Sequence, residues 1–66
     1  MLSEREIMNN GFKELLFQEQ VLANKLAELH KEITDPPIQT MFQGMEMASR
    51  TRQSMITQKM SGYGIV

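Results

Sequence analysis

The sequence predicts an all-α fold, an antiparallel helical hairpin that pairs with a second copy to form a four-helix bundle. Apolar residues recur at alternating steps of four and three along both halves of the chain, which is the pattern of an amphipathic helix. One turn sequence, TDPP at 34–37, separates the halves. Each apolar stripe carries one charged residue near its centre, Glu19 in the first half and Arg52 in the second.

The composition indicates one small domain, 1–66, without a covalent staple. The chain has no cysteine, which excludes disulfides and thiolate metal sites, and its one histidine disfavours a zinc site within a single chain. The net charge is −1 with acids and bases interspersed, which argues against a nucleic-acid surface. The longest apolar runs are far shorter than a membrane span. We therefore expect a cytoplasmic protein that binds neither nucleic acid nor membrane.

The first helix is predicted over 4–33. Ser3 and Glu6 have the spacing of a capping box, in which the serine hydroxyl and the glutamate carboxylate each accept a backbone N–H of the other residue. An apolar stripe follows, and Glu19 completes its spacing. The stripe consists of Met8, Phe12, Leu15, Leu22, Leu26, Leu29 and Ile33, and it is widened by Leu16, Ala23 and Ala27.

The turn is predicted at 34–36, the second helix over 37–60 and a tail over 61–66. Asp35 is a favourable N-cap, and a proline follows where its missing N–H costs nothing. Gly62 is expected to take the left-handed conformation after the helix. The inward positions are Ile38, Met41, Met45, Ala48, Arg52, Met55 and Lys59, beside a second column of Phe42, Ser49, Ile56 and Tyr63.

The short turn forces the two helices to run antiparallel, so residues whose numbers sum to about 70 should face each other. On this register Glu19 lies opposite Arg52. Two adjacent apolar columns on each helix make a face that one hairpin cannot cover, which predicts a homodimer, with a larger oligomer or a different protein partner as the alternatives. The expected facing pairs are Leu15 with Met55, Leu22 with Ala48, Leu26 with Met45, and Leu29 with Met41.

The charged pair is interpreted as a structural layer that sets register, rather than as a ligand or proton site. The sequence has no glycine-rich phosphate loop, no nucleophile–base pairing and no carboxylate dyad. We therefore predict no catalytic residue, no cofactor and no metal. His30 is interpreted as a surface or half-buried histidine near a helix end. The seven methionines are interpreted as core filler, with an adaptable partner surface as the alternative.

Four segments between residues 15 and 63 carry a resemblance to a known family: LLFQE at 15–19, EITDP at 32–36, MF at 41–42 and SGY at 61–63. In these segments the chain resembles coat F-type spore coat proteins of endospore-forming Firmicutes. The resemblance implies a ferritin-like four-helix bundle in which each half is one hairpin. It also implies a non-catalytic structural role, deposition in the spore coat, and other coat proteins as partners.

The same resemblance raises metal binding as the main alternative. Ferritin-like di-iron proteins place a glutamate on one helix and Glu-x-x-His on the next. Glu19 matches the first glutamate, but Arg52 and Met55 stand at the level of its partners. The only nearby acid of the second helix, Glu46, is expected to face Lys25. A di-iron-type or degenerate metalloprotein thus remains an alternative, and a small regulatory bundle that binds another protein is a further one.

Overall fold

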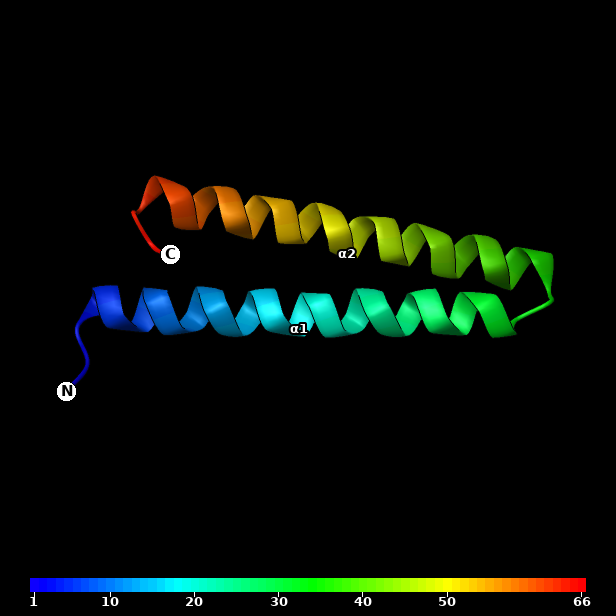
Figure 1. Cartoon of the computed structure of the whole chain (residues 1–66), viewed down its shortest axis with the longest axis horizontal. Coiled ribbons are helices and arrows are strands. Elements are labelled where there is room, and N and C mark those ends of the chain that lie inside the picture. The colour runs from blue at the N-terminus through cyan, green and yellow to red at the C-terminus, as the bar shows by residue number, and fades with distance from the viewer.

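Two long helices and a short turn make up the whole structure, a computed structural model that describes residues 1–66 (Figure 1). Helix α1 spans Glu4–Glu32 and helix α2 spans Pro36–Gly62. The helices pack against each other in opposite directions, with both termini at one end and the turn at the other. The hairpin is elongated, 49 × 21 × 14 Å. The predicted all-α hairpin is therefore confirmed, with α1 ending and α2 beginning one residue earlier than expected.

Both helices begin at the caps that the sequence predicts. The Ser3 hydroxyl accepts from the Glu6 N–H at 3.1 Å, and the Glu6 carboxylate accepts from the Ser3 N–H at 3.2 Å. A carboxylate oxygen of Asp35 accepts from the Ile38 N–H at 3.5 Å, and prolines occupy the first positions of α2. Each cap satisfies backbone donors that have no partner inside the helix.

The end of α2 differs from the prediction. The helix continues through Gly62, and Gly64 takes the left-handed conformation, with φ of 69°. The Ile65 N–H donates to the Met60 carbonyl at 2.8 Å and the Gly64 N–H to the Ser61 carbonyl at 3.0 Å, the two bonds of a Schellman motif. Met60 and Ile65 are both buried. The prediction for Gly62 is wrong because only a turn at Gly64 brings these two apolar side chains together.

Hydrogen bonds between the helices fix their register. The Ser49 hydroxyl donates to the Glu19 carbonyl at 2.9 Å. Near the termini, the Arg5 guanidinium donates to the Tyr63 carbonyl at 3.0 Å. The numbers in both pairs sum to about 70, which is the antiparallel register predicted from the short turn.

The core of the hairpin is a narrow seam between the helices. Ala23 and Ser49 are fully buried at its middle, and Leu26 is nearly so. Because alanine and serine are small, the backbones approach closely there, and larger neighbours lie on the flanks. The seam comprises Phe12, Leu16, Glu19, Ala23, Leu26 and His30 of α1, with Phe42, Glu46, Ser49, Gln53, Ile56 and Met60 of α2.

The seam corrects the expected facing pairs. Leu15, Leu22, Met41, Met45 and Met55 lie outside it and are between 38% and 60% exposed. The column that was expected to lie second on α2, with Phe42, Ser49 and Ile56, is instead the inner one. Periodicity identified both columns, but the packing of small residues selected which of them closes the hairpin.

Neither helix contains an apolar stretch long enough to cross a membrane.

Candidate functional site

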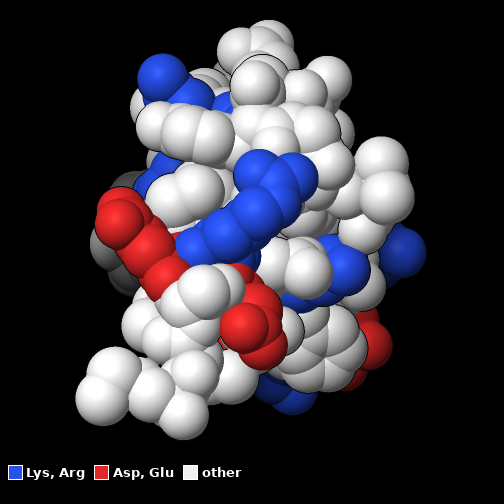
Figure 2. Space-filling view, turned by 90° about the vertical axis from the view of Figure 1, so that its left-hand side faces the viewer, with Lys and Arg blue, Asp and Glu red and all other residues white.

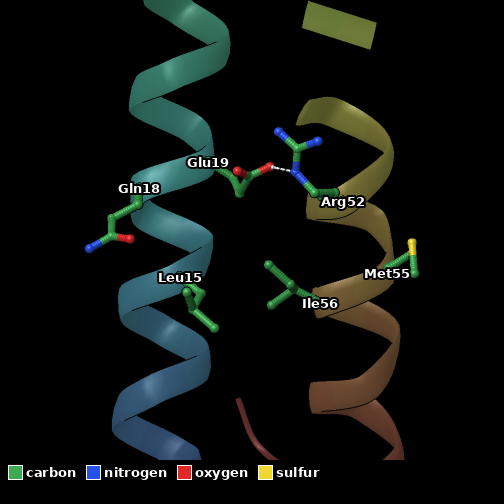
Figure 3. A pocket seen from close by; sticks show the side chains of 6 residues that line it. All are labelled: Leu15, Gln18, Glu19, Arg52, Met55 and Ile56. Carbon is green, nitrogen blue, oxygen red and sulfur yellow. Dashed lines mark hydrogen bonds and ion pairs between the residues drawn. The ribbon is translucent and has the colours of Figure 1, made fainter. Parts of the chain in front are cut away.

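A shallow groove on one side of the hairpin is the candidate site (Figure 3). It has a cavity volume of about 340 Å³ and takes residues from both helices. Glu19 and Arg52 meet across it, while Leu15 and Ile56 point toward each other beside them. Its lining consists of Leu15, Gln18, Glu19, Arg52, Met55 and Ile56.

The groove belongs to a longer surface, which we call the apolar strip. Its members recur every seven residues on α1 and at steps of four, three and seven on α2, and this spacing keeps side chains on one face of a helix that packs along a neighbour. Leu15 and Met55 line the groove together, so their columns lie on the same side of the hairpin. The strip comprises the exposed Leu15 and Leu22 and the half-buried Leu29 of α1, with the exposed Met41, Met45, Ala48 and Met55 of α2.

A second groove, which has no residue in common with the first, has a mostly polar lining. It is lined by Gln20, Arg50 and Gln53, with further hydroxyl and amide side chains and only one apolar residue. Side chains of this kind remain hydrated at little cost, whereas a cluster of exposed leucine and methionine side chains does not. Of these two grooves, the first is therefore the better suited to a partner.

The ion pair lies at the edge of the seam and faces the groove. The Arg52 Nε donates to the Glu19 Oε2 at 2.6 Å. The Glu19 side chain is 17% exposed and that of Arg52 is 49% exposed, so the layer is wet in a single hairpin. At this exposure an ion pair contributes about 0–1 kcal/mol.

Hydrogen bonds from two side chains of α2 to the Glu19 backbone hold this residue at its level of the hairpin. Its carbonyl oxygen accepts from the Ser49 hydroxyl at 2.9 Å and from the Gln53 amide at 3.3 Å. The carboxylate is then free to turn toward the groove. The terminal nitrogens of Arg52 point away from Glu19 in Figure 3 and have no hydrogen-bond partner within the chain. The site therefore retains donors that the hairpin itself does not use.

The residues considered for a metal do not form a cluster. No three carboxylate or histidine side chains gather at one place. Glu46 pairs with Arg50 of its own helix at 2.9 Å, so the expectation that it faces Lys25 is wrong. Lys25 instead lies 3.9 Å from Glu28. The i,i+4 pairing prevails because both members sit on one helix face at short range.

His30 is half-buried near the turn, where it joins the two helices. Its Nε2 lies 2.7 Å from the Gln43 amide nitrogen. The amide donates to this ring nitrogen when the imidazole carries its proton on Nδ1. This contact is a structural link between α1 and α2.

The end of the hairpin that carries both termini is closed by a contact that the sequence did not predict. Tyr63 stacks at a tilt on Phe12, with ring centroids 6.3 Å apart, and its carbonyl accepts from Arg5. Acidic and basic side chains lie next to one another among uncharged ones at this end (Figure 2). The seven-residue spacing of Phe42, Ser49, Ile56 and Tyr63 was the sequence signal that could have predicted this contact.

Neither the apolar strip nor the ion pair carries a nucleophile with a base positioned to activate it. No family model, curated protein or solved structure matches the chain.

Proposed function

We propose that this chain is a non-catalytic structural protein that self-associates through the apolar strip into a four-helix bundle. One observation carries the proposal: five of the large apolar side chains that the hairpin leaves exposed lie together along one side of it, namely Leu15, Leu22, Met41, Met45 and Met55. Proteins that act as monomers rarely expose large clusters of apolar side chains. Burying the remaining half of each such side chain contributes about 1 kcal/mol.

A second copy is the partner that best fits the strip. An interface with two-fold symmetry uses the same patch on both subunits, so the patch must complement itself. The strip has apolar residues on either side of a central layer that contains one positive and one negative charge. A surface with balanced charges at its centre can meet its own copy without net repulsion.

The role in the cell follows from the resemblance to coat F-type spore coat proteins. Under this proposal the bundle is an assembly unit that is made in the cytoplasm and deposited in the spore coat, with other coat proteins as partners. A fluorescently tagged copy should then form a ring around the forespore during sporulation. Diffuse fluorescence throughout sporulation would refute the coat role and leave self-association standing.

The self-association is tested by light scattering coupled to size exclusion, using two matched double variants. Leu15→Gln/Met45→Gln removes strip residues from both helices. Val21→Gln/Met47→Gln makes similar changes at exposed positions outside the strip. Leu15 and Val21 are 51% and 52% exposed, yet they lie about 120° apart around α1 at 100° per residue.

Wild type and the Val21/Met47 variant should show twice the 7.6 kDa chain mass, whereas the strip variant should show a lower mass. If the strip variant unfolds, the unfolding midpoint of the wild type decides the matter. It should rise with protein concentration, because dimerisation and folding are linked. A stably folded wild-type monomer at micromolar concentration would refute the proposal.

A further inference from the structure

We propose that the two-fold axis of the dimer runs parallel to the helices, so that each Glu19 lies between its own Arg52 and the partner's Arg52. This inference rests on the proposed dimer. It assigns the geometry of the interface and a charge site that one chain cannot complete. The chain contributes one glutamate and one arginine, and the second copy contributes the other two charges.

Two hairpins can join their strips face to face about a two-fold axis in two ways. With the axis parallel to the helices, each α1 packs against the partner's α2 and both turns lie at the same end. With the axis across the helices, each α1 packs against the partner's α1 and the turns lie at opposite ends. Both arrangements are closed dimers, so the surface of the hairpin has to select between them.

The charges favour the parallel axis. Arg52 uses only its Nε toward Glu19, and the pair leaves the Glu19 Oε1 without a partner (Figure 3). A guanidinium carries five N–H donors, so Arg52, which lines the groove, keeps further donors that the chain does not use. With the parallel axis these donors meet the partner's carboxylate. With the crosswise axis, Glu19 meets Glu19 and Arg52 meets Arg52 in an interface that excludes water, where like charges repel strongly.

The apolar residues favour the same axis. With the parallel axis, α1 faces the partner's α2 at the levels at which it faces its own α2. Leu15 then lies at the level of Met55, and Leu22 at the level of Ala48. The crosswise axis through the charge layer instead places Met45 opposite Lys59, because each is seven residues from Arg52. That arrangement would bury an ammonium group against an apolar side chain.

The two arrangements place the turns at different separations. Thr34 is exposed in the turn, and the chain contains no cysteine, so Thr34→Cys accepts a single nitroxide label. Fifteen residues separate Thr34 from Glu19, which corresponds to about 22 Å along the helix axis. The crosswise axis therefore predicts labels about 45 Å apart. The parallel axis predicts about 20–30 Å, set by helix spacings of 8–10 Å and the label arms.

The experiment measures dipolar distances between labels on the full chain. A Thr34 distance of about 20–30 Å supports the parallel axis. A label at Val21→Cys is the control, because this exposed residue is only two positions from Glu19 and has a near neighbour under both axes. If the Val21 labels of the two copies give a distance while the Thr34 labels lie about 45 Å apart, the dimer stands but its axis is not parallel to the helices. No interchain distance at either label would overturn the dimer and the axis together.

Discussion

If a second copy covers the ion pair between Glu19 and Arg52, the coupling energy between these two residues should rise, and this rise can be measured. In a single hairpin the half-exposed arginine makes this a surface pair, for which coupling is about 0.2–1 kcal/mol. In a dry interface, removal of one partner costs about 3–5 kcal/mol, because the remaining charge is buried alone. We expect each single variant, Glu19→Leu or Arg52→Leu, to cost about 3 kcal/mol, and the double variant far less than the sum.

The chain contains a matched control pair. Arg50 and Glu46 are 2.9 Å apart, with side chains 50% and 24% exposed, close to the 49% and 17% of Arg52 and Glu19. Arg50 lines the mostly polar second groove. Its pair should therefore couple by only about 0.3–0.5 kcal/mol, as exposed i,i+4 pairs do.

Urea unfolding of the four variants of each pair, at one fixed protein concentration, gives both coupling energies. The proposal requires a coupling of at least about 1.5 kcal/mol for Glu19–Arg52, well above that of the control. Without a second copy, the two ion pairs have similar exposure and should show similar coupling energies. Equal couplings for the two pairs would refute the idea that a second copy covers the charge layer.

Three further predictions follow from the packing. Leu26→Ala should lower the free energy of unfolding by about 2–5 kcal/mol in urea melts, because Leu26 is buried in the seam. Gly64→Ala should cost about 1–2 kcal/mol, because φ is positive there, whereas Gly44→Ala, where an added Cβ meets nothing within 4 Å, should stabilise α2 by about 0.5–1 kcal/mol. Elemental analysis after growth in iron-rich medium should find far less than one metal per chain, because Arg52 holds the Glu19 carboxylate; stoichiometric iron lost in Glu19→Ala would contradict this.

Much of the hairpin was predictable from short stretches of sequence. Ser3 with Glu6, and Asp35 before two prolines, begin the helices as expected, because a cap depends on residues within one turn of each other. The short turn and the seven-residue spacing were sufficient for the antiparallel register. That register brought Glu19 and Arg52 within hydrogen-bonding distance, although they lie 33 positions apart.

Other features depend on contacts between distant residues. A stop at Gly62 and a stop at Gly64 are equally plausible locally, and only the burial of Ile65 beside Met60 distinguishes them. The helix register placed Glu46 opposite Lys25, but the shorter path to Arg50 on its own helix prevailed. Local sequence patterns do not decide where α2 ends or which cation pairs with Glu46, because each alternative is compatible with the residues around it.

By itself, the sequence determined two amphipathic helices, their caps, their antiparallel order and a wide apolar face on each. Only the tertiary structure decided which part of that face closes the hairpin. Periodicity shows which residues share a helix face, but it does not show which partner that face meets. The close approach at Ala23 and Ser49 decides this, because small side chains there let the backbones meet. The leucines and methionines of the apolar strip are thereby left on the outer side, where a second copy can reach them.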